Sequence, residues 1–433
     1  MSEMMVAGPC RTSGSIEVSG NKNGALPAIA AAMLTEEPVT LRNVPDIGDV
    51  HAMLAIIRSL GGQAEFSSGV VRLCGAGLRG GELPGHLCHA VRTSLLFAGP
   101  LARRLGRVTL GAPGGDVIGR RRLDTHLYGL HKLGIDFEAQ ASRYVFTRRA
   151  STPCELFLDE ASVTATEHIM ATAALTPGVT VIRNAACEPH VRQLGEMLAA
   201  MGAAVEGGGT NTVTVHGVRA LSGCDLTLEG DYIEAASYLA LCAATGGDIT
   251  VTGHIVPSSY WMARRVFEKF GCPFTLTPGR IEMRAPERLR IAPDFNHAIP
   301  VIADGPWPQF PSDMMSCLVA MATQAEGTVL FFEKMFESRL HFVDKLVSMG
   351  ASAVICDPHR VVISGPAALR GAELSSPDIR AGMALIRAGM ALIIAACCAS
   401  GTSVIHNMDM VRRGYPNLAG KLQALGMAVR LEE

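Results

Sequence analysis

The sequence predicts an α/β protein made of six similar units, arranged as two globular halves of three units each. The first observation is a pattern repeated about every 70 residues, in which an apolar helical run ends in a glycine and a strand-like run follows. The second is a β-branched run that precedes most of these helices. The repeated glycines stand at positions 61, 134, 202, 271, 350 and 426, and the β-branched runs at 36–44, 177–185, 246–254, 326–334 and 400–408.

The elements of each unit follow from local chemistry. A glycine directly after a periodic apolar run is typical of a helix end, because glycine adopts the left-handed backbone conformation without steric cost. The β-branched runs favour strands, and a polar turn and a helix follow each of them. A unit of strand, helix, strand and further short strands is larger than a solenoid repeat and resembles a small α/β subdomain.

The middle of the chain separates the third unit from the fourth. It lies within residues 226–237, so we expect the chain to cross from one half to the other near Gly230. The predicted domains are residues 1–21 with 230–433, which carries both termini, and residues 22–229. Two-lobed α/β proteins bind ligands in the cleft between their lobes, so we expect the active site in that cleft.

The composition excludes several classes of protein. The 433 residues carry 40 acidic and 38 basic side chains, and the net charge of -2 lacks the electrostatic footprint of a protein that binds nucleic acid or a membrane surface. Aromatic residues make up only 5% of the chain, which argues against a platform for stacking bases.

The cysteines and the apolar stretches point to a reducing, aqueous environment. The 12 cysteines form no CxxC motif, and no His/Cys cluster has the spacing of a zinc site. The segment from Met1 to Arg11 lacks the pattern of a secretory signal peptide. We therefore expect reduced thiols, a cytoplasmic location, and no resident metal or cofactor. The longest apolar stretch, 381–399, is interrupted by Arg387, so we expect a buried helix there instead of a membrane span.

One heptad, RAGMALI, occurs twice in tandem, at 380–386 and 387–393. Seven residues turn a helix through about 700°, close to two full turns. A helix can therefore absorb the extra copy, keep the same face inward and grow by roughly 10 Å. The extra residues can equally form a bulge or a loop, and the sequence leaves both arrangements open.

Charged residues beside glycine-rich and proline-rich turns are the candidates for chemistry. Lys22 and Asn23 lie in GNKNG, a turn that opens an apolar helix, where backbone amides and the helix dipole add to the charge of the lysine. The loop within 110–134 presents Asp116 and then three consecutive arginines, whose forked hydrogen bonds suit phosphates and carboxylates. A solvated turn and an exposed charged loop are the alternative interpretations.

Two further stretches place charge in an apolar or glycine-rich context. The loop DGPWPQFPSD contains three prolines and ends at Asp313, whose rigidly held carboxylate suits a general base or simply caps the next helix. Near the end of the chain, SPDIRAG contains Asp378 and Arg380, and MVRRGY contains Arg412 and Arg413. An arginine that is buried or faces a cleft needs an anionic partner.

Taken together, these lysines, arginines and loop carboxylates suit a site for a doubly anionic substrate. The sequence has no Walker loop, no GxGxxG after a strand, no GxSxG and no HExxH. It therefore argues against nucleotide hydrolysis, nicotinamide chemistry, serine hydrolysis and zinc proteolysis.

The same stretches resemble the enolpyruvyl transferase family, and most closely its members that act on UDP-N-acetylglucosamine. The family's motifs occur in order over essentially the whole chain: GNKNGALP, VRTSLLFAGPLARR, LGAPGGDVIG, SVTATEHIM, NAACEPHV, FPSDMMS, MFESRLHFVDKL, DIRAGMALI and RRGY. The resemblance implies two domains, each an inside-out α/β barrel of three similar units with pseudo-threefold symmetry.

The resemblance also implies an activity. The enolpyruvyl group of phosphoenolpyruvate would be transferred to the 3'-hydroxyl of UDP-N-acetylglucosamine by addition and elimination, with release of phosphate. That reaction is the first committed step of peptidoglycan synthesis, and so serves cell wall biogenesis, cell shape and cell division.

The resemblance assigns roles to individual residues. Lys22 corresponds to the lysine that binds phosphoenolpyruvate and takes part in catalysis, and Asn23 to the contact with the amino sugar. Asp313 corresponds to the carboxylate that takes the proton from the attacking hydroxyl. The arginines expected around the phosphate and carboxylate are Arg92, Arg121 and Arg413.

The remaining expected contacts bind the sugar nucleotide or lie near the C-terminus. The segment expected to hold the uridine comprises Arg121, Arg122, Leu123, Asp124 and Thr125. The loop beside the diphosphate comprises Ser162, Val163 and Thr164, and the stretch beside the sugar is Met335 and Phe336. The family's Asp-x-Arg corresponds to Asp378 and Arg380.

The sequence departs from the common family pattern at Asp116, which stands where a cysteine is usual in a mobile loop of the 22–229 domain. A carboxylic acid can still deliver a proton, so we expect Asp116 to be the general acid. Burial must then raise the pKa of Asp116 against the pull of nearby arginines. A carboxylate is a poorer target for an epoxide than a thiolate, so we expect insensitivity to fosfomycin.

Three other departures affect the acceptor and the C-terminal motif. Arg122 and Thr125 replace common residues of the uridine segment, and Thr164 replaces a common glycine. The heptad duplication directly follows the Asp-x-Arg motif. These departures leave two alternatives open, namely a transferase for another nucleotide acceptor and a non-catalytic paralogue that binds a sugar nucleotide without turnover.

Overall fold

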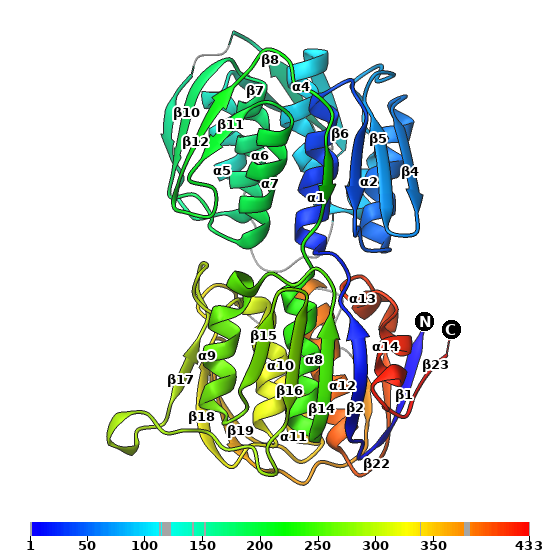
Figure 1. The fold of residues 1–433 in the computed structure, drawn as a ribbon, viewed down its shortest axis with the longest axis vertical. Helices are drawn as coiled ribbons and strands as arrows, with labels where there is room; N and C mark the ends of the chain where they lie inside the picture. Colours follow the sequence, from blue (N-terminus) through cyan, green and yellow to red (C-terminus); the bar gives the residue numbers. More distant parts are fainter. Residues whose placement is uncertain are drawn as a thin grey trace. The chain divides into compact units, whose positions relative to one another are not determined.

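The computed structural model describes residues 2–111, 114, 123–140, 143–150, 153–337, 339–375 and 382–432. The chain divides into two compact units (Figure 1), here called the terminal unit and the central unit. The terminal unit holds the residues up to Ser19 and from Gly230 onward, and the central unit holds the described residues from Gly20 to Glu229. The first change of unit thus falls two residues before the expected boundary. The reason is that Asn21 caps the first helix of the central unit and donates its backbone N–H to the Glu229 carbonyl over 2.8 Å.

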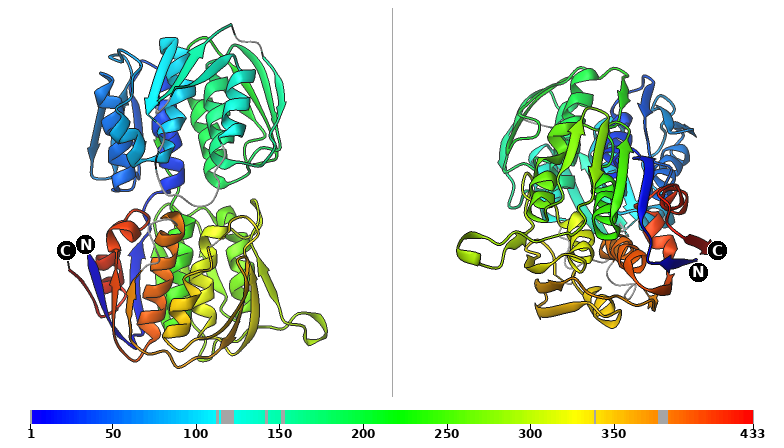
Figure 2. Two further views of the ribbon diagram at one scale, coloured as in Figure 1. Left: turned by 180° about the vertical axis from the view of Figure 1, so that it is seen from behind. Right: turned by 60° about the horizontal axis from the view of Figure 1, so that its bottom comes forward.

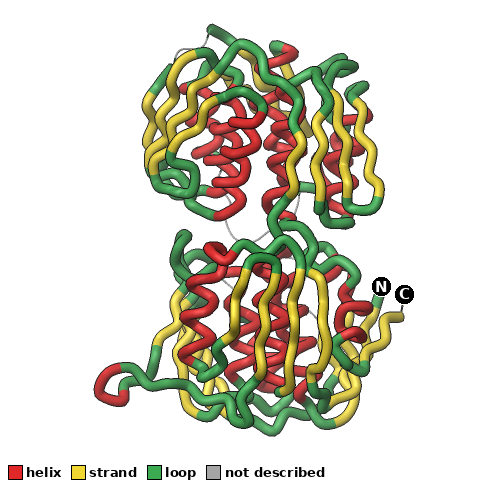
Figure 3. The backbone as a smooth tube through the Cα atoms, in the orientation of Figure 1, coloured by secondary structure: helices red, strands yellow, loops and turns green. Residues whose placement is uncertain are grey.

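Six sheets of one design build the two units (Figure 3), as the repeat predicts. In each sheet an edge strand pairs in parallel with a central strand, and an antiparallel pair completes the other side. Five sheets have four strands. The sixth has three, and the isolated parallel bridge between Glu82 and Thr109 stands in place of its edge strand.

The central unit contains three of the sheets with their helices. The first sheet comprises β13 (Asp225–Thr227), β3 (Val39–Arg42), β5 (Val70–Cys74) and β4 (Gln63–Ser67), with α1 (Lys22–Ala31), η1 (Ala32–Leu34) and α2 (Gly48–Ser59). The second comprises β6 (Arg107–Gly111), β8 (Arg143–Arg148) and β7 (Ile135–Gln140), with α3 (Gly85–Ala90), η2 (Arg92–Phe97), α4 (Ala98–Leu105) and α5 (Asp124–Lys132). The third comprises β11 (Ala204–Glu206), β12 (Thr212–Gly217), β10 (Gly178–Arg183) and β9 (Glu155–Phe157), with α6 (Val163–Ala174) and α7 (Pro189–Ala200).

The terminal unit contains the other three sheets. The first comprises β15 (Phe274–Thr277), β16 (Arg280–Arg284), β14 (Gly247–Thr252) and β2 (Thr12–Glu17), with α8 (Tyr232–Thr245), η3 (Pro257–Tyr260), α9 (Trp261–Lys269) and, beyond them, η4 (Phe295–His297). The second comprises β17 (Val301–Ala303), β18 (Gly327–Phe332), β20 (Arg360–Gly365) and β19 (Ser352–Asp357), with α10 (Ser312–Ala322) and α11 (Val343–Ser348). The third comprises β21 (Glu373–Ser375), β22 (Gly401–His406), β1 (Glu3–Gly8) and β23 (Val429–Glu432), with α12 (Gly382–Cys398), α13 (Met408–Arg412) and α14 (Leu418–Ala424).

The chain closes on itself in this last sheet. β1 lies between β22 and β23 and pairs antiparallel with both, so the N-terminal and C-terminal strands are neighbours (Figure 2). Two strands also carry the chain between units. β2 precedes α1 in sequence but pairs with β14, whereas β13 precedes α8 but pairs with β3.

In each repeat the first helix is buried and the second covers the outside. Nearly every described side chain of α8, α10 and α6 is buried, whereas α2 and α9 keep exposed polar faces. A helix that is apolar all round must lie inside a protein. The two units therefore each enclose their own hydrophobic core, which is the predicted inside-out arrangement. All six repeated glycines have positive φ, between 66° at Gly271 and 112° at Gly202, which confirms their role at helix ends.

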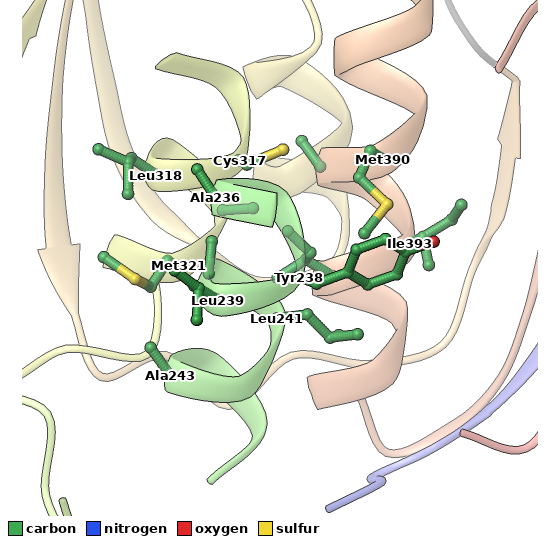
Figure 4. Close-up of a cluster of buried hydrophobic side chains, with 14 of the residues drawn as sticks. Ala236, Tyr238, Leu239, Leu241, Ala243, Cys317, Leu318, Met321, Met390 and Ile393 are labelled. Atoms are coloured by element: carbon green, nitrogen blue, oxygen red, sulfur yellow. The ribbon is translucent and has the colours of Figure 1, made fainter. Parts of the chain in front are cut away.

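The duplicated heptad is absorbed by α12. This helix of 17 residues contains the last five residues of the first copy and the whole second copy. Figure 4 shows Met390 and Ile393 of α12 packed in one cluster with side chains of α8 and α10. The stretch from Ile386 to Cys397 is buried, which confirms a buried helix there. None of the helices in the described part of the chain has the length and apolar character needed to cross a membrane.

Substitution of Gly389, in the second copy, tests whether this copy is placed in α12 as described. Alanine normally favours a helix over glycine by roughly 1 kcal/mol. A Cβ atom at Gly389, however, would lie 2.3 Å from Cγ2 of Val411 in α13. We therefore expect Gly389→Ala to lower the free energy of unfolding by about 1–3 kcal/mol in urea titrations.

Gly48 provides the matched control, because it begins α2 and a Cβ atom there would meet nothing within 4 Å. Gly48→Ala should stay within about 0.5 kcal/mol of the parent. A Gly389→Ala protein as stable as this control would contradict the register of α12.

Candidate active site

The expected site residues that the structure describes lie mainly where the inner helices begin. Lys22 and Asn23 are the first two residues of α1, Val163 and Thr164 begin α6, and Asp313 is the second residue of α10. The expected residues that lie outside the described residues are Asp116, Arg121, Arg122, Asp378 and Arg380.

Lys22 is held at the start of α1 by an ion pair. Asn21 caps the helix, because its side-chain oxygen accepts from the backbone N–H groups of Asn23 at 2.8 Å and Gly24 at 3.3 Å. The Lys22 ammonium lies 2.7 Å from Asp49 Oδ2 in the first turn of α2, and both side chains are largely buried. The cation is thus fixed beside a helix N-terminus, where the dipole also favours an anion.

A buried hydrogen-bond chain joins α5 to the start of α6. His126 Nε2 lies 3.2 Å from Thr164 Oγ1, and His126 Nδ1 lies 3.1 Å from His168 Nδ1. His168 Nε2 accepts the backbone N–H of Gly99 at 2.9 Å. Thr164 therefore contacts the residue that follows Thr125, which is itself buried.

The backbone N–H of Gly99 fixes the direction in which protons are donated along these hydrogen bonds. Because Gly99 donates to Nε2 of His168, the proton of a neutral His168 lies on Nδ1 and is donated to His126. The proton of His126 then lies on Nε2 and is donated to Thr164. Burial, reinforced by the positive charge of Arg92, lowers the pKa of His126 to about 3, and burial likewise lowers the pKa of His168. Both imidazoles are therefore neutral at physiological pH.

Arg92 stands at the start of η2 and is half-buried. Burial lowers the pKa of Arg92, but a guanidinium remains charged at any physiological pH. Leu123 and Asp124 lie at the start of α5, and Ser162 caps α6 by accepting from the Ala165 N–H at 3.4 Å. All of these residues lie at the starts of helices in the central unit.

In the terminal unit, Asp313 lies between two arginines. Arg339 Nη1 donates to Asp313 Oδ1 at 2.7 Å, and Arg387 Nε lies 3.7 Å from Asp313 Oδ2. Pro311 occupies the N-cap position of α10, so Asp313 does not cap that helix. The loop before it is anchored by the buried Phe310 and by Trp307, whose ring packs edge-on against Tyr232 at 5.4 Å. The carboxylate is thus rigidly held, as the proline-rich loop predicts.

A second carboxyl group lies behind Asp313. The Ser312 hydroxyl is 2.6 Å and 2.7 Å from the two carboxyl oxygens of Glu333, which is buried. Burial and then the neighbouring carboxyl of Asp304 raise the pKa of Glu333 to about 8. Glu333 is therefore largely protonated at neutral pH and adds no full negative charge beside Asp313.

The stretch beside the expected sugar position also meets this cluster. Phe336 packs its ring under the Arg339 guanidinium, with 4.4 Å between Cζ and the ring centroid, and Met335 is exposed. Arg413 follows α13 directly and is half-buried. The structure thus gathers Asp313 and Phe336 around Arg339.

Sequence reasoning missed the partners of the charged residues. Asp49, Arg339 and Glu333 were not singled out, and Arg387 was noted only as an interruption of an apolar stretch. The FESRL motif holds Arg339 and is the only sequence signal that pointed near it. Ion-pair partners are brought together by the fold from distant positions, and no local pattern marks them.

Known proteins share this fold. The family model described as EPSP synthase (3-phosphoshikimate 1-carboxyvinyltransferase) matches residues 6–422. The structure of the enolpyruvyl transferase NikO from Streptomyces tendae aligns with a TM-score of 0.87 at 22% identity, covering 99% of this chain and 98% of that one. EPSP synthase from Acinetobacter baumannii aligns with a TM-score of 0.76 at 17% identity, covering 100% of both chains. The fold therefore defines the class of two-unit enolpyruvyl transferases.

Full-length relatives identify the branch of this class. The UDP-N-acetylglucosamine 1-carboxyvinyltransferase of Treponema denticola is 45% identical, with 100% of both chains covered. The proteins of the same name from Bradyrhizobium diazoefficiens and Treponema pallidum are 46% and 47% identical, covering 99% of this chain and 97% and 99% of the relatives. The chain belongs to the UDP-N-acetylglucosamine 1-carboxyvinyltransferase family.

The neutral, buried His126 makes a prediction about acid stability. In the unfolded chain a histidine has a pKa of about 6.5. Below that pH the unfolded state therefore binds a proton at His126, whereas the folded state does not. Stability therefore falls as the pH drops from about 6.5 towards 3. We expect His126→Gln, which keeps a donor and an acceptor, to lose about 2 kcal/mol less than the parent between pH 7 and pH 5.

The measurement is urea unfolding at both pH values, with His216→Gln as the control, because His216 is an exposed surface residue. An equal loss in the parent and in His126→Gln would show that His126 titrates normally in the folded state.

Proposed function

We propose that this protein transfers the enolpyruvyl group of phosphoenolpyruvate to the 3'-hydroxyl of UDP-N-acetylglucosamine, with release of phosphate. The observation that carries the proposal is the Asp313 carboxylate, rigidly held by Arg339 at the start of an inner helix, in a chain that is 43–47% identical over its full length to enzymes of that name. The reaction commits its product to peptidoglycan synthesis. The 12 free cysteines support a reducing compartment, and we place the protein in the cytoplasm.

Asp313 is the general base in this proposal. The sugar hydroxyl adds to C2 of phosphoenolpyruvate and gives its proton to Asp313, while C3 gains a proton. A carboxylate beside guanidinium groups stays ionised to lower pH than a solvated one, and it is therefore ready to accept a proton at neutral pH. The tetrahedral ketal then loses phosphate as C3 loses a proton.

The cationic residues stabilise the charge that moves during these steps. Lys22 is fixed at the start of α1, and Arg92 stands in the same unit at the start of η2. With Arg121 and Arg413 they would offset the charge of the substrate carboxylate and the leaving phosphate. Asn23, the segment 121–125, the loop 162–164 and Met335–Phe336 would hold the sugar nucleotide, and Asp378 with Arg380 would complete the set.

Asp116 is the proposed general acid for C3. It lies outside the described residues, so its role rests on the match of LGAPGGDVIG to the family's catalytic loop. A carboxylic acid serves this role if the closed site keeps it protonated.

Release of phosphate from phosphoenolpyruvate tests the proposal directly. We expect release only when UDP-N-acetylglucosamine is present, and a loss of about 10²–10⁴-fold in kcat for both Asp116→Asn and Asp313→Asn, because each removes a proton-transfer group. Asp357→Asn is the matched control, since Asp357 is paired with Arg360 on the surface of the same unit.

The other outcomes separate the alternatives. Binding of UDP-N-acetylglucosamine without phosphate release would indicate a non-catalytic paralogue. Release that requires a different nucleotide would indicate another acceptor.

Asp116 also determines the response to fosfomycin. A thiolate opens the epoxide of this drug far more readily than a carboxylate does, so we expect the parent enzyme to keep its activity after incubation with fosfomycin. Asp116→Cys should become sensitive over time and gain the mass of the drug. Mass spectrometry of the intact protein checks this, and a covalent adduct on Asp116 of the parent would overturn the expectation.

A further inference from the structure

The second copy of the duplicated heptad places an arginine beside the proposed base. Arg387 begins that copy and lies within α12, and its side chain is only 8% exposed. The resemblance to the family points to Arg380, which begins the first copy. Nothing in the family motif singles out Arg387, so its function is a separate question.

The contacts of Arg387 converge on Asp313. Its Nε lies 3.7 Å from Asp313 Oδ2, while Arg339 contacts the other carboxylate oxygen at 2.7 Å. The guanidinium lies over the ring of Tyr415, 5.0 Å from its centroid, and the Tyr415 hydroxyl is 2.8 Å from Ser237 Oγ in α8. The two oxygens of Asp313 are therefore each faced by a different cation.

Four titratable groups act on Arg387 in the part of the chain that the structure describes. The titratable groups that act on it are Asp313 and Cys317 of α10, Asp231 before α8, and Tyr415 after α13. Burial raises the pKa of Tyr415 well above its ordinary value and raises that of Cys317, so both are neutral. Asp313 is the carboxylate within salt-bridge distance of Arg387 among the described residues.

A purely structural arginine is a poor explanation for this arrangement. Arg387 is buried in the most apolar helix of the unit, and its Nη1 finds no hydrogen-bond partner among the described residues. A buried charge with an unmet donor costs stability, and an apolar side chain of similar size is often preferred at such a position. Arg387 is partly compensated by its hydrogen bond and ring contact with Tyr415 and by its pairing with Asp313, and this last contact points to a functional role.

The helical repeat explains why the second copy supplies this arginine. Two positions seven residues apart point in almost the same direction from a helix, but lie roughly 10 Å apart along its axis. Arg387 is the heptad arginine that the described part of α12 contains. The packing of the second copy against α8 and α13 places Arg387 there.

We propose that Arg387 is a positioning residue for Asp313, which it orients with Arg339 and keeps ionised as the general base. The proposal rests on the function proposed above for Asp313. It assigns the orientation of Asp313 to the arginine of the second heptad copy.

The pH dependence of kcat tests the proposal on the full-length protein, with phosphoenolpyruvate and UDP-N-acetylglucosamine as the probes. Removing one cation from a carboxylate makes it take up a proton at higher pH. We therefore expect Arg387→Met to move the acid limb of the kcat profile up by about one pH unit or more. Arg387→Lys should move it less, and the KM for both substrates should change less than about threefold in each variant.

Two controls separate this effect from a general structural one. Arg264→Met removes an exposed arginine from α9 of the same unit and should leave the acid limb unchanged. Deleting one heptad gives the same sequence whichever copy is removed, and the arginine that remains keeps the spacing of Arg387 to the end of α12. This single-copy protein should retain the acid limb of the parent.

The outcomes are distinct. Failure of the parent to release phosphate would remove the proposed function itself. An active parent whose acid limb is unmoved by both Arg387 variants would overturn the role of Arg387 alone, as would an acid limb that moves in the single-copy protein. If Arg387→Met does not fold, as judged by circular dichroism and thermal unfolding, the Lys variant and the single-copy protein decide the question.

Discussion

The burial of one complete helix in every repeat is the constraint on which the rest of this structure depends. An inner helix such as α8 or α10 is apolar on all its faces, so it is stable only when sheets and other helices surround it. Three such helices share a core in each unit, and their long sides have no room for a charged group that lacks a partner. The polar groups of the proposed site therefore lie at the starts of these helices or within their first two turns. This explains why Lys22, Ser162 and Asp313 all lie within two residues of the start of a helix.

The N-terminal ends of the inner helices favour anions. Near two of these ends the fold also places a cationic side chain that forms an ion pair with a carboxylate. In the terminal unit the second turns of α8, α10 and α12 meet where Ser237, Cys317 and Arg387 lie close together. Two of the buried charges at the helix starts have counterions: Lys22 faces Asp49, and Asp313 faces Arg339. Such pairs contribute little net stability after desolvation. Their effect is to fix side chains in position before a substrate arrives, which is the form of catalysis that needs least reorganisation.

The helices and strands of the fold could be predicted from the sequence because local conformational preferences determine them in each repeat. Gly61 and Gly350 mark helix ends through their own backbone conformation, and the β-branched run at 246–254 becomes β14 through its own preferences. The partners within the site were not readable in this way. Asp49 is 27 residues from Lys22, and Arg339 is 26 from Asp313, and only the path of the chain brings them together. The neutral state of His126 depends on burial and on the charge of the distant Arg92, neither of which has a local signature.

The tandem heptad shows how far an apolar helix tolerates insertion. A copy of seven residues preserves the direction of every side chain, so either copy of RAGMALI satisfies the same inward face. What distinguishes the copies is distance along the axis, and that is fixed at the C-terminal half of α12. There Gly389 lies against Val411, and Met390 and Ile393 fill the core with α8. These contacts hold the second copy in place within α12. The extra seven residues are therefore compatible with a closed core and with the contact between Arg387 and Asp313.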